Sequence, residues 1–253
     1  MRNRMIFAGA LAAMAFASAA SAQTLDSLPF LKKLKLAKAG DEDAQMSVAF
    51  DYEKGAGEAR LSRREAAKWY RLAAQQGNVE AQFRLARIIH DGDEGLKKSP
   101  EMAATLYESA AKQGHVEAQN WLGYSYQHGI GFAQSDTEAV NWYRRAADAG
   151  LAMAENNLGL MYLNGKGVPQ DRTEAFKLFE RAANKSDTWG LNNIGGLFEM
   201  GWGTPQDKQK ALQSYKASAA LGNEQAKKNM ERLAASLAQD NGPVTGATSP
   251  APN

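Results

Sequence analysis

The sequence predicts an all-α protein, an α/α solenoid of about five helical hairpins that ends in a capping helix. Two observations lead to this fold class. A motif of small and aromatic residues returns every 36 or 37 residues, and each copy holds two helix-length segments with their own start and stop signals. Because one hairpin cannot bury its apolar face alone, the copies must stack on one another.

The second helix of each hairpin carries the clearest pattern. Its small and aromatic residues lie three, four, seven and eight positions after an opening alanine, which places them on one helical stripe. A serine or aspartate four residues before that alanine is a good N-cap. A glycine ends four copies, whereas Ser186 takes that place in the fourth, where we expect a looser turn. The opening residues are Ala66, Ala103, Ala139, Ala175 and Ala211.

The first helix of each hairpin recurs with the same period. Apolar or small residues follow its opening position by four, five and eight residues, so they too form one stripe. A glycine closes every copy, as expected where a helix ends in a left-handed residue. The opening residues are Ala44, Ala81, Ala118, Ala154 and Gly190.

The combined pattern, A-x-x-x-L-G-x-x-Y-x-x-G-x-G, a loop, then A-x-x-W-Y-x-x-A-A-x-x-G, resembles the Sel-one-like repeat, a relative of the tetratricopeptide repeat. The second copy departs most, with Ala86, Ile89 and Glu94 at motif positions. The resemblance implies a right-handed superhelix whose first helices line the concave face, and a protein that binds other proteins. The five units are 41–77, 78–114, 115–150, 151–186 and 187–222, followed by a polar capping helix at 223–238.

The two ends of the chain are expected to lie outside this solenoid. Residues 1–22 have a basic start, the apolar run Met5–Ala17 and the small residues Ala20-Ser21-Ala22, which predict a signal peptide cleaved before Gln23. The apolar run is shorter than the roughly 20 residues that span a bilayer, so no transmembrane segment should remain after cleavage. Residues 239–253 are rich in Pro, Gly, Ser and Thr and are expected to be disordered.

Charge and composition exclude several classes of function. The chain has 30 Lys and Arg against 28 Asp and Glu, and removal of Arg2 and Arg4 leaves a neutral protein, which is not the charge of a nucleic-acid binder. Cysteine is absent, so thiolate metal sites and cysteine nucleophiles are excluded.

An enzyme is not expected, and neither is a cofactor or a metal. Nucleophile elbows, phosphate loops and zinc-protease helices are missing. His90 and His128 could approach each other near Asp91, but a metal site there would still need a third ligand and supporting groups. His115 occupies a helix-cap position and is interpreted as a loop residue.

The residues two, six and nine positions after each opening residue of the first helix fall opposite the buried stripe at roughly 100° per residue. Asparagine recurs there and offers both a donor and an acceptor to an extended peptide, although it could also be a tolerated solvent-exposed residue without a binding role. Aromatic and apolar residues on such a face mark an interaction site, unless they contact the N-terminal helix. The predicted partner-binding residues are Phe50, Phe83, Arg87, Asn120, Tyr124, Asn156, Leu160 and Asn192.

The segment 23–40 is basic and amphipathic. Leu31, Leu34 and Leu36 within it are expected to cap the first repeat, although the segment could instead touch anionic lipid or an acidic partner.

Together these features predict an exported scaffold for a protein or peptide ligand, located in the periplasm or, alternatively, secreted. The layout resembles periplasmic regulators that bind the outer portion of membrane sensor kinases, including those that govern exopolysaccharide production. An assembly factor for envelope polysaccharide or secretion machinery, and a secreted effector, are the alternatives. The identity of the partner and the oligomeric state do not follow from the sequence.

Overall fold

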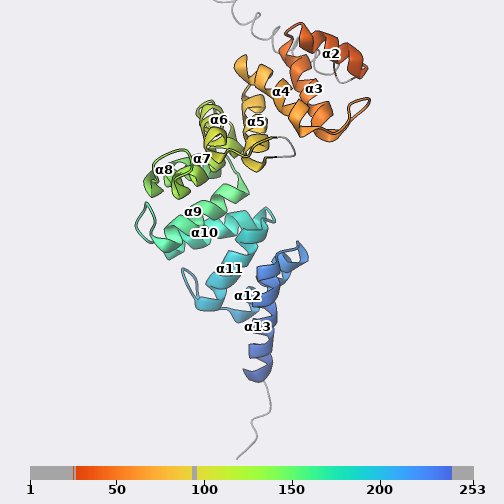
Figure 1. The fold of residues 1–253 in the computed structure, drawn as a ribbon. Helices are drawn as coiled ribbons and strands as arrows, with labels where there is room; N and C mark the ends of the chain where they lie inside the picture. Colours follow the sequence, from red (N-terminus) through yellow and green to blue (C-terminus); the bar gives the residue numbers. More distant parts are fainter. Residues whose placement is uncertain (1–24, 26, 93–95, 241–253) are drawn as a thin grey trace, which may run out of the picture. The chain divides into compact units, whose positions relative to one another are not determined.

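The structure, a computed structural model, describes residues 25, 27–92 and 96–240 (Figure 1). The predicted signal peptide lies outside the described residues, as does the tail from 241 onward. Every element in the described part is an α-helix, as the sequence predicts. The helices are α2 Phe30–Lys38, α3 Glu42–Lys54, α4 Arg63–Gln75, α5 Val79–Asp91, α6 Pro100–Lys112, α7 Val116–His128, α8 Asp136–Asp148, α9 Ala152–Asn164, α10 Arg172–Asn184, α11 Thr188–Met200, α12 Lys208–Ala220 and α13 Glu224–Asp240.

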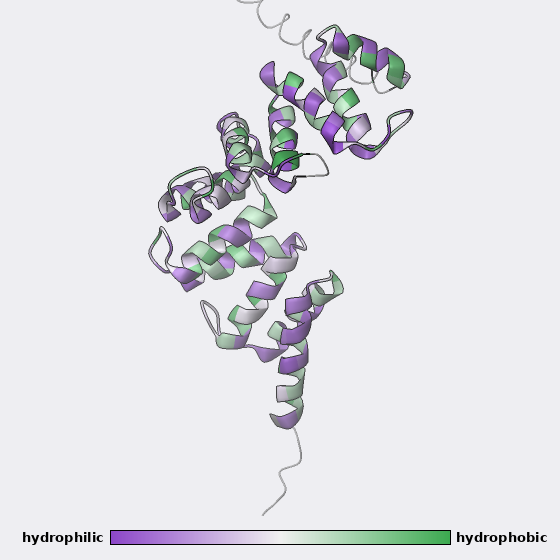
Figure 2. Cartoon of the chain, viewed as in Figure 1, coloured by the Kyte–Doolittle hydropathy of each residue, from purple (hydrophilic) through white to green (hydrophobic). Residues whose placement is uncertain are grey.

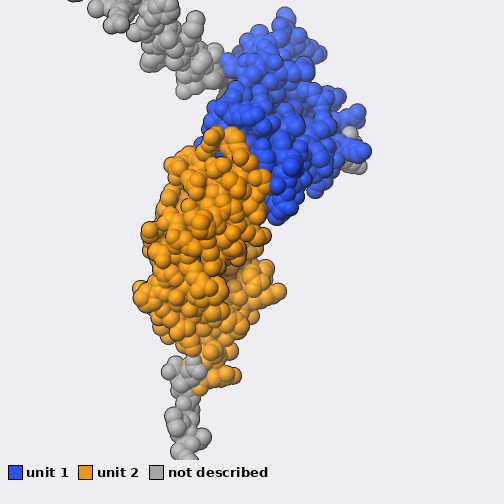
Figure 3. Space-filling model, turned by 90° about the vertical axis from the view of Figure 1, so that its left-hand side faces the viewer, with its two compact units in different colours: residues 1–134 blue, residues 135–253 orange. Residues whose placement is uncertain are grey.

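The chain divides into two compact units, residues 1–134 and 135–253 (Figure 3). Unit 1 contains α2 to α7, with the hairpins α3–α4 and α5–α6, and α4 packs on α5 and α6 on α7. Unit 2 contains α8 to α13, with the hairpins α9–α10 and α11–α12, and α10 packs on α11 and α12 on α13. Within each unit, consecutive helices therefore stack as the repeat pattern predicts.

The predicted helix starts are confirmed. The side chains of Ser62, Ser99, Ser135, Asp171 and Asp207 each accept a hydrogen bond from a backbone N–H in the first turn. The predicted stops are confirmed as well, because the glycines that end α4, α6, α8 and α12 all have positive φ. Ser186 adopts the same left-handed conformation, with φ of 60°, so the fourth turn keeps its shape at a steric cost that glycine avoids.

Small residues bring the two helices of a hairpin close together, and aromatic residues fill the space between them. All five opening alanines of the second helices are fully buried, as are Tyr70, Tyr107, Tyr143 and Phe179. A Cβ atom added at Gly159 would come within 2.6 Å of the Phe179 ring. The glycine thus lets the ring lie directly against the α9 backbone. Hydrophilic and apolar residues alternate along most helices, as an amphipathic pattern requires (Figure 2).

The terminal helices α2 and α13 differ in part from the expectation. Helix α2 packs against α3 through Ala37 and Leu34, and the Phe30 ring meets that of Tyr52 edge-on at 5.3 Å. Capping by Leu34 agrees with the prediction, but Leu31 and Leu36 are 64% and 39% exposed and do not serve as core residues. At the other end, α13 continues to Asp240, two residues beyond the predicted end of the capping helix.

Candidate functional site

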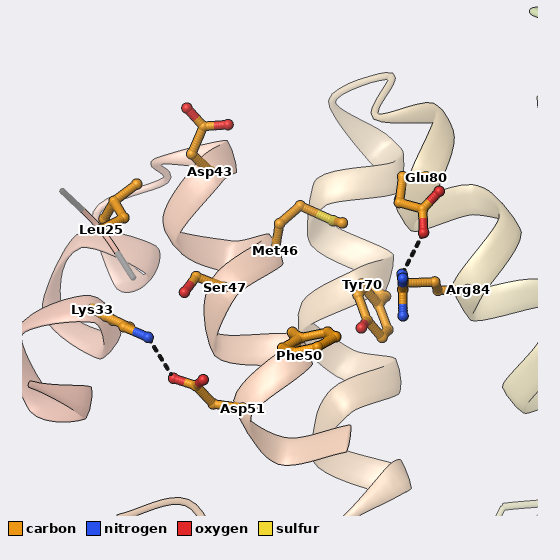
Figure 4. A pocket seen from close by; sticks show the side chains of 10 residues that line it. All are labelled: Leu25, Lys33, Asp43, Met46, Ser47, Phe50, Asp51, Tyr70, Glu80 and Arg84. Atoms are coloured by element: carbon orange, nitrogen blue, oxygen red, sulfur yellow. Dashed lines mark hydrogen bonds and ion pairs between the residues drawn. The ribbon is translucent and has the colours of Figure 1, made fainter. Parts of the chain in front are cut away.

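A cavity of about 500 Å3 lies in unit 1, between α2, α3, α4 and α5 (Figure 4). Its apolar part is formed by Leu25, Met46 and Phe50. Phe50 remains 43% exposed, and the guanidinium of Arg84 lies 5.5 Å from its ring centroid. An aromatic ring left open to solvent in a cavity favours contact with a partner.

One buried ion pair and several partly buried interactions hold the walls of this cavity. Lys33 of α2 pairs with Asp51 of α3 at 3.0 Å, with both side chains almost fully buried. On the opposite wall, the Tyr70 hydroxyl donates to Glu53 at 2.6 Å, and Arg84 pairs with the same carboxylate at 3.2 Å. Burial and the neighbouring carboxylate raise the pKa of Tyr70, so its hydroxyl stays protonated at neutral pH. The walls are therefore rigid before any ligand arrives.

The mouth of the cavity is acidic. Glu80 bonds to both His115 and Arg84, and the hydrogen bond from His115, reinforced by Arg84, lowers the pKa of Glu80. Asp43 is exposed at the same edge, and its carboxylate has no hydrogen bond or ion pair with any residue that the structure describes. Lys33 pairs with Asp51, and Arg84 pairs with both Glu53 and Glu80. The ammonium of Lys54 also lies 5.8 Å from the Phe50 ring centroid, so together with Asp43 the charged groups around the cavity sum to a net charge of −1.

A second, smaller cavity of about 230 Å3 lies in unit 2, between α9, α11, α12 and α13. An asparagine network borders it. Asn193 donates to Asn156 at 2.8 Å, and Asn229 donates to Asn192 at 2.9 Å. These bonds connect successive repeats, so the amides of Asn156 and Asn192 are used to join α9, α11 and α13.

The structure corrects where several predicted partner-binding residues lie. Asn120, Asn156 and Asn192 are only 3%, 6% and 9% exposed, although the helical period predicted an open face. Phe83 is also buried and stacks on the His115 ring at 4.2 Å. Leu160 is half-buried and packs against the core cluster around Phe179. The same reason applies to all of these residues. A first helix packs against neighbouring repeats as well as against the second helix of its own hairpin, so more of its surface is buried than one apolar stripe predicts.

The remaining predicted residues are accessible. Phe50 lines the cavity, and Arg87 is exposed above the Phe83 ring at 5.9 Å. Tyr124 is 37% exposed and lies 4.2 Å from the His128 ring. Within unit 1 the structure thus brings Phe50 into a cavity and leaves Arg87 and Tyr124 on the surface.

The histidines are engaged in packing and capping. His115 accepts a hydrogen bond from the Ala118 N–H through Nδ1, and its Nε2 lies 3.0 Å from Glu80, so it is the N-cap of α7. His90 contacts the rings of Tyr107 and Trp121. Across residues 25, 27–92 and 96–240, no group of three or more His, Asp or Glu side chains is arranged to hold a metal ion.

Sequence reasoning missed Lys33 and Asp51. Asp51 lies seven positions after the opening Ala44, and the equivalent residues Ile88, Met161 and Leu197 are buried. The sequence signal for this ion pair is an aspartate at a position that is apolar in three other copies, together with a lysine on the inner side of α2. Their pairing requires knowing that α2 packs on α3.

Comparison with known proteins identifies the repeat. The Sel1 repeat model matches residues 42–78, 79–115, 116–151, 152–187 and 190–223. The chain belongs to the Sel1 repeat family. Proteins of this family are typically non-catalytic scaffolds for protein interactions. A comparison with curated proteins gives no significant match.

Solved Sel1 repeat structures resemble this one. A Sel1 repeat protein from Oxalobacter formigenes is 32% identical over 79% of this chain and 86% of its own, with a TM-score of 0.71. The protective antigen c5321 from uropathogenic Escherichia coli, which displays an SLR fold, is 31% identical with a TM-score of 0.71, covering 85% of this chain and 44% of that protein. A putative sel1 repeat protein from Klebsiella pneumoniae, at 24% identity and a TM-score of 0.51 over 82% of this chain and all of its own, shares the fold.

Proposed function

We propose that this Sel1 repeat protein is an exported adaptor that binds an extended segment of a partner protein in the cavity of unit 1. The observation that carries the proposal is Phe50, an aromatic ring 43% exposed within a cavity whose walls are held by a buried ion pair and by partly buried hydrogen bonds. A preformed site loses little conformational freedom on binding, so more of the contact energy contributes to affinity.

The chemistry of the cavity indicates the kind of segment it accepts. Leu25, Met46 and Phe50 offer an apolar surface that suits a bulky apolar side chain such as leucine or phenylalanine. At the mouth, Asp43 is unpaired among the described residues, and Glu80 shares its arginine with Glu53. The segment that fits therefore carries a bulky apolar residue next to a lysine or arginine.

The compartment and pathway form the finer part of the proposal. The apolar run Met5–Ala17 followed by Ala20-Ser21-Ala22 supports export, and the periplasm is the proposed location. The partner is then an envelope protein, such as a sensor kinase that controls exopolysaccharide. Assembly of envelope polysaccharide or secretion machinery, or action as a secreted effector, would use the same binding mode.

The test compares two double variants of the chain from Gln23 to Asn253. Phe50→Ala with Asp43→Asn changes the cavity, whereas Leu61→Ala with Glu58→Gln makes the same kind of change at exposed residues that do not line it. Each is used as bait on detergent-solubilised envelope, and fluorescent peptides pairing phenylalanine with lysine or with glutamate serve as direct probes. Loss of a buried aromatic contact weakens binding by about 30-fold or more.

A protein retained by the wild type and the control variant but lost by the cavity variant supports the proposal, as does preference for the lysine peptide. Equal retention by both variants places the partner elsewhere on the molecule. A preference for the glutamate peptide contradicts the assigned charge.

A further inference from the structure

The outer face of α2 carries exposed lysines and leucines that the cavity does not use. Lys33, Leu34 and Ala37 point inward to α3. At about 100° per residue, Lys32, Lys35 and Ala39 fall within an arc of about 60° on the opposite side. Leu31 and Leu36 lie about 40° beyond the two edges of this arc. The outer face, consisting of Leu31, Lys32, Lys35, Leu36 and Ala39 together with Lys38 on its flank about 20° beyond Leu31, is exposed throughout.

The lysines of this face have no partner in the described part of the protein. The ammonium groups of Lys32, Lys35 and Lys38 make no ion pair, hydrogen bond or ring contact with any residue described there, and the sequence of α2 contains no acidic residue. Of the acids that follow α2 or lie beneath it, Asp41 caps α3, Glu42 accepts a hydrogen bond from Asn78 and Asp51 pairs with Lys33, whereas Asp43 lines the cavity of unit 1. Within the described structure, no acidic side chain therefore pairs with the lysines of this face.

The helix is held rigidly. The buried pair between Lys33 and Asp51, together with the edge-on contact between Phe30 and Tyr52, fixes α2 on the first repeat. The outer face is thus ordered in the free protein, and docking requires no folding step.

We propose that the outer face of α2 binds the surface of an anionic phospholipid bilayer. Lysines spread over a broad arc suit a plane of phosphate groups, because their flexible stems let each ammonium reach a separate lipid. Leu31 and Leu36, 64% and 39% exposed on the two sides, enter the boundary between headgroups and acyl chains. A folded acidic protein could bind this face only if its own acidic groups were held at fixed positions that match the lysines and leave room for the two exposed leucines.

Binding of this kind is peripheral. None of the helices within residues 25–240 that the structure describes is long and apolar enough to cross a membrane. Each lysine near an anionic surface strengthens partitioning by about fivefold, so three lysines contribute about 100-fold at low salt. Attachment through α2 does not depend on the proposed function, but it would hold the cavity of unit 1 near membrane proteins.

The experiment measures flotation of the chain from Gln23 to Asn253 with vesicles. This form lacks the apolar run Met5–Ala17, which could bind lipid by itself, and it keeps every described helix. The vesicles contain phosphatidylethanolamine and phosphatidylglycerol, with pure phosphatidylcholine as the neutral comparison. The test variant is Lys32→Gln, Lys35→Gln, Lys38→Gln. The control is Lys216→Gln, Lys227→Gln, Lys228→Gln, which removes the same charge from exposed lysines of unit 2 that pair with no described residue.

The wild type and the control are expected to float with the anionic vesicles, and the test variant to bind about 100-fold more weakly. Added salt should weaken wild-type binding, and Leu31→Ser with Leu36→Ser should weaken it at all salt concentrations. A thermal melt verifies that each variant is folded. Phe50→Ala should float like the wild type, which separates this face from the cavity.

Equal flotation of the test and control variants would overturn the proposal, and so would failure of the folded wild type to bind anionic vesicles. If that protein ignores vesicles but is retained by an acidic protein through these three lysines, the face is a protein-binding surface instead.

Discussion

Two adjacent glycines of α11 are expected to respond in opposite ways to alanine. An alanine Cβ at Gly195 would lie 2.8 Å from two carbons of the Tyr215 ring and 3.3 Å from the Ala211 carbonyl oxygen. At Gly196 the nearest atom is the Tyr215 hydroxyl, at 3.6 Å, an ordinary contact. Both substitutions gain the same helix propensity, so the difference between them isolates packing.

The magnitudes follow from these contacts. Gly→Ala within a helix gains about 1 kcal/mol, so Gly196→Ala should stabilise unit 2 by about 0.4–1 kcal/mol. Gly195→Ala adds an overpacking cost of about 1–3 kcal/mol. Tyr215 cannot move aside easily, because it is 3% exposed and its hydroxyl donates to Glu199 at 2.9 Å. The net effect at Gly195 is a destabilisation of about 1 kcal/mol, and the two variants should differ by about 2 kcal/mol.

Thermal unfolding followed by circular dichroism measures this difference. At about 2–4 °C per kcal/mol, Gly196→Ala should raise Tm and Gly195→Ala should lower it, with a separation of about 4–8 °C. The double change Gly195→Ala with Tyr215→Leu relieves the contact and serves as a check on its origin. If both single variants shift Tm in the same direction, the close approach of α11 to the ring is not what selects glycine at 195.

Three further predictions concern other groups. Tyr107→Phe should leave Tm unchanged or raise it, because the buried hydroxyl has no hydrogen-bond partner among the described residues. Tyr215→Phe should instead destabilise the fold by about 1.5–3 kcal/mol, because it removes a hydrogen bond to a carboxylate. Thermal melts of the two variants test this difference. Ser186→Gly should stabilise the turn after α10 by about 0.5–1 kcal/mol, since Ser186 has φ of 60°, and an unchanged Tm would contradict this. The hydrogen bond from Arg232 lowers the pKa of Glu199 in the folded protein. The stability that ionised Glu199 contributes is therefore fully present above about pH 4.3, the unfolded pKa, and is lost as pH falls through the lower folded pKa. Over this acidic range, the Tm of Glu199→Gln should fall less steeply with pH than the Tm of the wild type.

The fold could be predicted largely because its signals are local. N-caps such as Ser62 and Asp171, and the glycines that end the helices, depend on a few neighbouring residues that every copy repeats. The sequence also predicted the buried stripe of the second helices correctly, since Tyr70, Tyr107, Tyr143, Phe179 and Tyr215 are all buried in the structure. Because the same caps, stops and stripe recur in five aligned copies, each copy strengthens the prediction of the helices.

The candidate site was less predictable because it depends on contacts between repeats. Phe83 was expected on an open surface, but it meets the N-cap His115 of the next repeat. Asn156 and Asn193 lie on successive first helices and bond to each other. A pattern within one helix does not show what the neighbouring helix places beside it. Among the predicted partner-binding residues, only Phe50 lines the cavity, because of its position opposite the core.

The repeats themselves nevertheless hold information about those contacts. The residue nine positions after the opening of the first helix lies near the buried aromatic residue of the second helix. Glu53 and Glu199 accept hydrogen bonds from Tyr70 and Tyr215. In the fourth repeat the aromatic residue is Phe179, which has no hydroxyl, and the equivalent position is Leu163, which packs against the same cluster.

A second pair changes in the same concerted way. The residue after the opening of the first helix meets the end of the second helix in its own repeat. Gln76 donates to Gln45 and Gln113 donates to Gln82, whereas in the fourth repeat Lys185 pairs with the fully buried Glu155. Two neutral amides are thus replaced by two opposite charges. Because most buried polar groups keep a partner, the copies of one chain act as variants of one another, and comparing them position by position identifies contacts that no single repeat shows.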